Sequence, residues 1–413
     1  MTFRQAEEYL LSLELFGMRF GLDRMHRLMT VLGLPQRRFA SIHVVGTNGK
    51  SSTVRFCAAI LERHGLSTGS YTSPHLGSFR ERIEVGEEPV PETDFAAAVA
   101  RAAQAAELVN RTSEPDDQVT QFEALTAAAY HELARRGVEV AVIEAGLGGR
   151  FDATNVIPSK VQVLTSVGLE HTRWLGPTLK DIAEEKLAVV RDHGTLVTGV
   201  LDEELVTIAH RVAAEQASNL VQAERDLGLA LRAPGRFQRG NFAIAAAAAE
   251  AFLGRPLDPD ALQAAARETS IPGRVEIVAR DPVTVYDGAH NPAGAHALAD
   301  SLGDVLGERR PRVAVIGVLE DKDAAAMLAE LLPHLDRVVY TRSQNPRSLS
   351  PATLASLAEK LGGPPAETVA DPREAVLRAG AIAGPAGAVL VTGSIYLIAD
   401  LVRAESGARA SSL

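Results

Sequence analysis

The sequence predicts an α/β protein of two domains, each built on a parallel sheet with helical crossovers. Short runs rich in β-branched residues alternate with alanine-rich helical stretches along the chain. A Pro-Gly pair at 272–273 follows a long helical stretch and separates an earlier set of strands from a later one. The chain has 413 residues, which is long for a single hydrophobic core. We therefore expect a first domain over 1–271 and a second over 272–413.

Each expected strand is an apolar run bounded by turn residues. The strands expected in the first domain are 42–45, 69–72, 138–143, 161–166 and 195–198. Those expected in the second are 283–286, 313–317, 337–341 and 388–392. Representative helices are expected at 95–108, 123–136, 242–252 and 352–361. This order of elements favours parallel pairing, because each crossover helix returns the chain to the same edge of the sheet.

Composition excludes several classes of protein. The net charge is −10, which disfavours a nucleic-acid partner or an anionic membrane surface. Cys57 is the single cysteine, so no internal disulfide can form, and a reducing cytoplasm suits the chain. The apolar run 386–402 is interrupted by polar residues and is too polar for a membrane span. We expect a cytoplasmic monomer that acts on small molecules.

The first strand leads into a glycine-rich loop and then a helix. The loop and the helix start comprise Gly46, Thr47, Asn48, Gly49, Lys50, Ser51 and Ser52. Backbone N–H groups, a helix N-terminus and a lysine ammonium then surround one small volume, which predicts binding of nucleotide phosphates. The spacing departs from G-x-x-x-x-G-K-[ST], because Val44 stands where the first glycine would be. Either Ser51 or Ser52 could reach a phosphate-bound Mg²⁺.

Polar residues also follow the other strands, where ligands of open parallel sheets bind. Ser73, Glu144 and His171 each come at or just after the end of a predicted strand. A buried carboxylate at that position would be costly unless it were paired or bound to a metal. A mixed oxygen and nitrogen set of this kind suits Mg²⁺ or Mn²⁺ rather than zinc. In the second domain, the segments 287–292 and 320–323 occupy equivalent strand ends.

Taken together, these segments resemble the folylpolyglutamate synthase/dihydrofolate synthase family of the Mur ligase superfamily. The resemblance rests on ordered motifs over almost the whole chain: G-L-D-R at 21–24, I-H-V-V-G-T-N-G-K at 42–50, T-S-P-H-L at 72–76, F-R-E-R-I at 79–83, Q-F-E-A at 121–124, E-A-G-L-G-G-R-F-D-A-T-N at 144–155, G-L-E-H-T-R-W-L-G at 168–176, G-R-F-Q-R-G-N at 235–241, P-G-R at 272–274, D-G-A-H-N-P at 287–292, D-K-D at 321–323 and T-G-S-I-Y-L at 392–397. It implies a P-loop ATPase domain of the Mur ligase type and a smaller Rossmann-like C-terminal domain.

The resemblance also implies roles for individual residues. It places ATP on the phosphate loop and Mg²⁺ on Ser73, Glu144 and His171, with K⁺ as a further cation. Lys186 falls where the family carries a carbamylated lysine at a second magnesium, although its helical context alone favours a solvated lysine paired with glutamate. The remaining implied contacts are Asn241 to adenine, Arg274 to the ATP phosphates, Asp287 and His290 to the nucleotide and amino-acid sites, and Phe122, Asp152 and Ala153 to the pterin or folate.

Two features qualify the resemblance. The family usually has glycine after the loop lysine, whereas this chain has Ser51, as in the cell-wall ligases of the superfamily. Those ligases carry a whole substrate domain before the loop, and the 45 residues that precede Gly46 are too few for one. The folate branch is therefore the better fit.

The resulting hypothesis is ATP-dependent amide formation between L-glutamate and a folate or dihydropteroate carboxylate, through an acyl phosphate. The main alternative is a ligase of the same fold that joins an amino acid to a different acid. A nucleotide kinase or ATP-hydrolysing switch would explain the loop but not the D-G-A-H-N-P segment, and a silent nucleotide-binding module would not need Lys50, Glu144, His171 and Asp287 together. The sequence leaves open whether one or both folate reactions occur, and which folate form is preferred.

Overall fold

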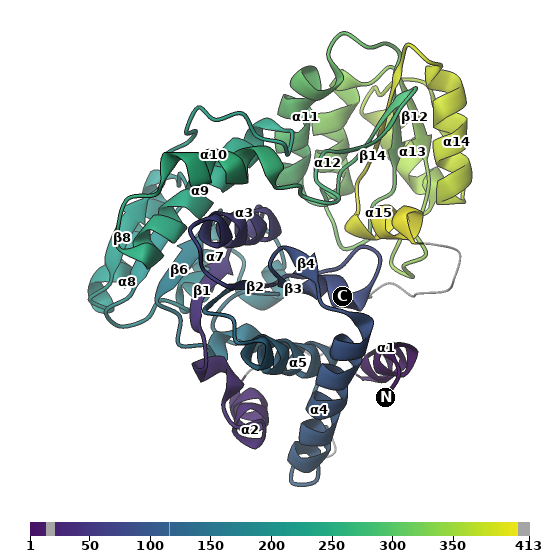
Figure 1. The fold of residues 1–413 in the computed structure, drawn as a ribbon. Helices are drawn as coiled ribbons and strands as arrows, with labels where there is room; N and C mark the ends of the chain where they lie inside the picture. The colour runs from purple at the N-terminus through teal and green to yellow at the C-terminus, as the bar shows by residue number, and fades with distance from the viewer. Residues whose placement is uncertain (14–20, 115, 404–413) are drawn as a thin grey trace.

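The structure is a computed structural model that describes residues 1–13, 21–114 and 116–403. It contains an eight-stranded sheet followed by a six-stranded sheet, joined through the segment 269–275 (Figure 1). Two stretches of the expected domains, 14–20 and 404–413, lie outside the described residues. Two sheets, each covered by helices that connect its strands, confirm the predicted α/β fold class.

The first sheet has the strand order β4-β3-β2-β5-β1-β6-β7-β8. Its strands are β1 (Ala40–Val45), β2 (Thr68–Tyr71), β3 (Ile83–Val85), β4 (Glu88–Pro89), β5 (Val140–Glu144), β6 (Val161–Leu164), β7 (Thr195–Thr198) and β8 (Asn219–Gln222). All neighbours pair in parallel except β2 with β3 and β3 with β4, which are antiparallel. The central strand β1 lies between β5 and β6, so the loop after Val45 emerges in the middle of the sheet edge.

Helices cover both faces of this sheet. One face packs against α1 (Phe3–Ser12), α2 (Asp23–Val31), α4 (Glu92–Asn110), α5 (Gln121–Arg136), α7 (Leu179–Leu187) and α8 (Glu203–Glu215). The other packs against α3 (Lys50–Arg63), α9 (Arg236–Leu253) and α10 (Pro259–Glu268). Ile42 and Val44 of β1 face α3 and α9, and Val45 faces α7. Such burial on both faces is typical of parallel strands.

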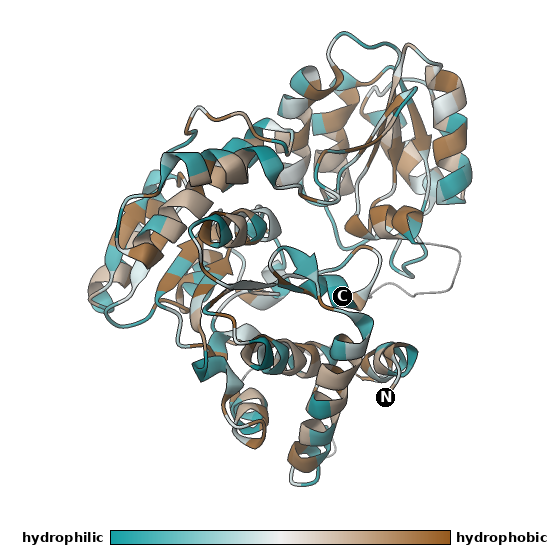
Figure 2. Cartoon of the chain, in the orientation of Figure 1, coloured by the Kyte–Doolittle hydropathy of each residue, from teal (hydrophilic) through white to brown (hydrophobic). Residues whose placement is uncertain are grey.

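The second sheet has the order β13-β12-β11-β14-β10-β9. Its strands are β9 (Glu276–Arg280), β10 (Val283–Tyr286), β11 (Arg312–Ile316), β12 (Arg337–Tyr340), β13 (Ala366–Thr368) and β14 (Ala388–Thr392). Its helices are α11 (Pro292–Leu306), α12 (Ala324–Leu331) and α13 (Pro351–Lys360) on one face, with α14 (Pro372–Ala383) and α15 (Ile395–Val402) on the other. The hydrophobic residues of this domain gather on its central strands and on α15 (Figure 2).

Short helices complete the chain where it turns between longer elements. These are η1 (Pro35–Arg37), η2 (Phe79–Arg82), η3 (Ala153–Val156), α6 (Thr172–Leu175) and η4 (Leu332–His334). Within the described ranges, no helix is both long and apolar enough to cross a bilayer.

The nine expected strands are all present, each within two residues of its predicted ends. Five further strands, β3, β4, β8, β9 and β13, were not predicted, and β9 pairs antiparallel to β10. The sheets are therefore mixed at their edges rather than parallel throughout. Most residues of β4, β8, β9 and β13 are half-buried or exposed. These edge strands therefore lack the continuous apolar run by which the buried parallel strands were predicted.

Candidate active site

The phosphate loop lies between β1 and α3 and needs both of its glycines. Gly46 and Gly49 have φ angles of 151° and 84°, which side-chain-bearing residues rarely adopt. A Cβ on Gly46 would lie 1.9 Å from Oγ1 of Thr165, and one on Gly49 would lie 2.3 Å from Oδ1 of Asn241. The first N–H groups of α3 have no partner within the helix, so they remain available to an anion.

Two lysines converge on this loop. Lys50 Nζ donates to the carbonyl oxygens of Gly46 and Thr47 at 3.1 and 3.2 Å. Lys186 Nζ, on α7, donates to the same Gly46 oxygen at 2.9 Å. Lys186 is 4% exposed, so it is not the solvated helix lysine that its sequence context favours. Burial, reinforced by the Lys50 charge, lowers the pKa of Lys186 to about 7.

Glu144 lies beside the loop with its carboxylate desolvated. It ends β5, is 2% exposed, and accepts hydrogen bonds from Ser51 Oγ at 3.0 Å and from the Ser73 N–H at 3.1 Å. Burial raises the pKa of Glu144, and the Lys50 charge and these two hydrogen bonds only partly offset the rise. Ser51, rather than Ser52, therefore supplies the hydroxyl that contacts the predicted metal carboxylate.

This environment fits a magnesium ion held partly by phosphate. A buried carboxylate flanked by Ser51 and Ser73 gains from a nearby cation, and Mg²⁺ commonly uses one or two carboxylates together with substrate phosphates. His171 does not join this cluster through any recorded contact; its Nε2 lies 3.6 Å from Oε1 of Glu170. Among the described residues, no three His, Cys, Asp or Glu side chains converge as a protein-only metal site.

A first prediction concerns Ser51. We expect Ser51→Gly to raise the Mg²⁺ concentration needed for half-maximal ADP binding by about tenfold, because a hydrogen bond to a charged group contributes roughly 1.5–3 kcal/mol. Ser51→Thr retains the hydroxyl and serves as the matched control. Titration of ADP binding by calorimetry at several Mg²⁺ concentrations measures the effect. An unchanged Mg²⁺ requirement in the glycine variant would show that Ser51 does not orient Glu144.

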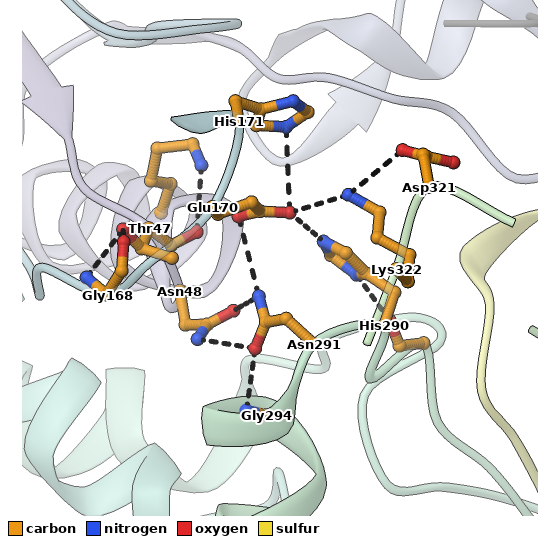
Figure 3. A network of polar contacts seen from close by, with 12 residues as sticks. Thr47, Asn48, Gly168, Glu170, His171, His290, Asn291, Gly294, Asp321 and Lys322 are labelled. Atoms are coloured by element: carbon orange, nitrogen blue, oxygen red, sulfur yellow. Dashed lines mark hydrogen bonds and ion pairs between the residues drawn. The ribbon is translucent and has the colours of Figure 1, made fainter. Parts of the chain in front are cut away.

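A second cluster crosses between the two domains (Figure 3). Glu170 follows β6, and its Oε1 accepts from Lys322 Nζ at 3.0 Å and from His290 Nε2 at 3.2 Å. Both His290 and Lys322 belong to the C-terminal domain. Burial would raise the pKa of Glu170, but the His290 hydrogen bond and the His290 and Lys322 charges hold it well below its usual range. The Glu170 carboxylate is therefore ionised, and its charge is stabilised by His290 and Lys322 of the C-terminal domain.

Asn291 extends this cluster to the phosphate loop. Its amide pairs reciprocally with the Asn48 amide, at 3.1 Å from Asn48 Nδ2 to Asn291 Oδ1 and 3.0 Å in the other direction. Thr47 in turn contacts the backbone of Gly168, two residues before Glu170. The sequence placed these segments at strand ends, but it assigned no role to Glu170, Asn291 or Lys322. The available signal is that all three lie within motifs that carry the family resemblance, namely G-L-E-H, D-G-A-H-N-P and D-K-D.

The predicted pair Arg274 and Asp287 lies where the chain enters the second domain. Asp287 is 2% exposed and accepts from the N–H groups of Val275 and Ala289 at 2.9 and 2.8 Å. Burial raises the pKa of Asp287, and the Arg274 charge opposes this. The Arg274 guanidinium lies against Gly288, where a Cβ would come within 2.2 Å of Nη1. The carboxylate therefore organises its own loop and attracts the hinge arginine.

The residue predicted to contact adenine lies behind the phosphate loop, and those predicted to contact the folate lie near the loop that follows β5. Asn241 is buried against Gly49 and donates to Gln238 Oε1 at 3.0 Å, so it supports the loop from behind. Phe122, at the start of α5, packs against Gly146 and lies 6.2 Å from the Tyr71 ring.

Asp152 and Ala153 are buried at the start of η3. The Asp152 carboxylate accepts from the N–H groups of Leu147 and Thr154 at 2.8 and 3.0 Å, so it stabilises the turn after β5. One cavity, of about 340 Å³, lies apart from these residues and is bordered by Arg55 and Glu84 among others.

A phosphate loop in one α/β domain, with lysines and a buried carboxylate around it and a second α/β domain closing over it, defines a two-domain nucleotide-dependent enzyme. Comparison with known proteins gives the family. Residues 273–395 match the model of the Mur ligase, glutamate ligase domain. The chain is 35% identical to the dihydrofolate synthase/folylpolyglutamate synthase of Mycobacterium tuberculosis, over 83% of this chain and 78% of that protein.

Further relatives agree. A probable bifunctional folylpolyglutamate synthase/dihydropteroate synthase of Haloferax volcanii is 34% identical over 97% of this chain, which spans about 50% of that longer protein. The solved structure of Mycobacterium tuberculosis folylpolyglutamate synthase complexed with ADP superposes with a TM-score of 0.90 at 31% identity, covering 96% of each chain. The chain belongs to the dihydrofolate synthase/folylpolyglutamate synthase family of ATP-dependent ligases.

Proposed function

We propose that this protein joins L-glutamate to the carboxylate of a folate or dihydropteroate, with ATP as the source of the leaving group. The observation that carries the proposal is the buried Glu144 beside a lysine-lined phosphate loop that a glutamate ligase domain closes over. The substrate carboxylate attacks the γ-phosphate and releases ADP. The amino group of glutamate then attacks the acyl phosphate and expels phosphate. A carboxylate needs this activation, because it is a poor acylating agent in water.

The chain's own residues act mainly by positioning and by neutralising charge. The N–H groups at the start of α3 cradle the phosphates, and Lys50 offsets their charge from within the loop. Arg274 reaches the phosphates from the hinge, where Asp287 attracts it. Glu144 and Ser73 would hold Mg²⁺, whose contribution is to neutralise charge on the transferring phosphoryl group. His171, which lies beside Glu170 in this structure, is proposed as a further ligand of the ion. Asn241, held against Gly49, contacts adenine.

Lys186 is proposed to carry a carbamate. Carbon dioxide reacts with the neutral amine, and at pH 8 a pKa of about 7 leaves about nine-tenths of Lys186 neutral. The carbamate would replace the buried ammonium with an anion and so remove its repulsion with Lys50. It would then help to hold a second magnesium. Neither Mn²⁺ nor K⁺ has a distinguishing contact in the described residues, and both stay predictions.

His290 is proposed to bind and orient rather than to act as the base for the incoming amine. Its Nδ1 donates to the Gly288 carbonyl at 2.9 Å, and its Nε2 faces the Glu170 carboxylate at 3.2 Å. Both ring nitrogens therefore have partners, and neither is free to take a proton from glutamate in this arrangement. For the acid substrate, Phe122 offers an aromatic ring that packs against Gly146, two residues after Glu144. Asp152 and Ala153, at the start of η3, are proposed as the other contacts of the acid.

The comparisons support a folate-type acid and give no support to the alternative of an unrelated carboxylic acid. The relatives' names include both dihydrofolate synthase and folylpolyglutamate synthase, so one or both reactions are proposed here. The expected partners are the small substrates alone. A monomer without a nucleic-acid or membrane partner, and the cytoplasmic location, remain predictions.

Product mass tests the function directly. After incubation with ATP, Mg²⁺ and glutamate, we expect dihydropteroate or tetrahydrofolate to gain the mass of one or more glutamyl residues, with one ADP released for each. Products from both acids would show two activities, and a product from one would show which is present. Release of ADP only with an unrelated acid would contradict the folate assignment.

A further inference from the structure

One asparagine at the contact between the two domains has no spare hydrogen-bonding capacity. Asn291 is 4% exposed and caps α11, with Oδ1 accepting from the Gly294 N–H at 2.8 Å. The same oxygen accepts from Asn48, and Nδ2 donates to Asn48 and to Glu170 Oε2 at 3.4 Å. An asparagine side chain offers two donors and two acceptor sites, so this set uses all four.

Asn48 is correspondingly tied to both domains. Its backbone N–H donates to Ser166 Oγ at 3.0 Å, and its carbonyl accepts from Thr165 and Ser166. Among the residues that the structure describes, its side-chain amide has partners only on Asn291. The backbone of the loop is therefore held by the N-terminal domain, and its side chain by the C-terminal domain.

Glu170 provides a second attachment next to the first. Its side chain and that of Lys322 are each 11% exposed, so the pair is largely removed from solvent and screening. Apart from the adjacent His171, the partners recorded for its carboxylate are His290, Asn291 and Lys322, all in the C-terminal domain (Figure 3). Removing either Glu170 or Lys322 would leave a buried charge without this partner, which destabilises the contact between the domains.

We propose that Asn291 and Glu170 are positioning residues that make the phosphate loop and the C-terminal groups His290 and Lys322 move as one unit. Nucleotide binding on the loop is then coupled to the orientation of the C-terminal domain. The coupling is reciprocal, so loss of the interdomain contacts weakens nucleotide binding. A loop already held in its binding shape also loses less conformational freedom on binding. The inference rests on the proposed function only in taking this loop as the nucleotide site.

The test separates this role from the capping of α11. Aspartate and serine are both good N-cap residues, so Asn291→Asp and Asn291→Ser keep the cap but remove the amide donors. We expect about tenfold weaker ADP binding by calorimetry in the presence of Mg²⁺ for both variants. The control is Asp371→Asn, which changes the N-cap of α14 away from the interface and should bind ADP as the wild type does.

Interdomain distance provides the second readout. Cys57 is fully buried, so fluorophores can be attached selectively to Arg101→Cys on α4 and Leu377→Cys on α14, both exposed. Single-molecule energy transfer should show a broader, shifted separation in the Asn291 variants. Glu170→Gln and Lys322→Met, which leave the Asn48–Asn291 pair in place, should broaden it as well and serve if the Asn291 variants fold poorly.

The outcomes are distinct. A double-mutant cycle of Asn48→Ala and Asn291→Ala should be non-additive in ADP affinity, and additivity would contradict the coupling. Wild-type ADP affinity together with a wild-type separation in the folded variants would overturn the proposal. Neither readout requires glutamate ligation, so a protein inactive on every acid tested would refute the proposed function without touching this inference.

Discussion

Glu144→Gln should abolish acid- and glutamate-dependent ADP release, with a loss of about 10³-fold or more. The change keeps the shape of the side chain and its contacts with Ser51 and Ser73, but it removes the charge that a phosphate-bound magnesium requires. A coupled assay of ADP release measures it. Glu84→Gln is the matched control, because Glu84 is also a buried carboxylate of the first sheet but pairs with Arg55 away from the loop.

The same substitution should not destabilise the protein. Since the pKa of Glu144 is raised in the folded state, the folded protein binds this proton more tightly than the unfolded chain, and the ionised carboxylate costs stability once the pH exceeds both values. At pH 7–8 the neutral glutamine should therefore leave the melting temperature unchanged or raise it. Full activity of the folded variant would contradict the assignment of Glu144 to metal binding, and a lowered melting temperature would contradict the predicted effect on stability.

Lys186→Met should reduce the rate of ligation by about 10²- to 10³-fold, the usual loss when one preorganised charged group is removed from an active site. If a carbamate is the active form, acetate or another short carboxylate should partly restore activity to Lys186→Ala, because the smaller side chain leaves space for it. A fully active Lys186→Arg variant would show that carbamylation is not needed. Mass spectrometry of the wild type in bicarbonate buffer provides an independent check.

The pKa of Lys186 also predicts a pH dependence. Between about pH 7 and its ordinary value of 10.5, the unfolded chain binds the lysine proton and the folded protein does not. The free energy of unfolding should therefore rise with pH across this window in the wild type relative to Lys186→Met. Activation by bicarbonate should increase through pH 7 for the same reason. Parallel urea titrations of the two proteins at pH 6, 8 and 10 measure the difference.

Much of this site could be predicted because its residues lie close to strand ends. The loop after β1, Glu144 after an apolar run and the Asp287 turn all follow from local pattern together with the rule that parallel strands present their carboxyl ends to one edge. Lys186 was added by the family resemblance, because the sequence of its helix alone predicts an exposed lysine, whereas the side chain is buried.

The rest depended on packing between segments that are far apart in the chain. Whether Ser51 or Ser52 faces Glu144 is decided by the rotation of α3 relative to β5, and the partner of Asn48 by an approach between segments 243 residues apart. Neither is a local property of the chain. The β3–β4 hairpin escaped prediction for a different reason: its strands have three and two residues, too short to show an alternating pattern.

The hinge has a mechanical consequence. The Gly273 carbonyl accepts from the Gly288 N–H at 2.9 Å, and Asp287 accepts from Val275, so the connecting segment is bonded to the turn that bears Asp287. In any rotation about this segment, displacement grows with distance from the axis. Arg274 and Asp287 therefore lie near the axis of such a rotation and would move little relative to the phosphate loop. We therefore expect a change of the angle between the domains to alter the proposed amino-acid contacts more than the proposed contact of Arg274 with the nucleotide.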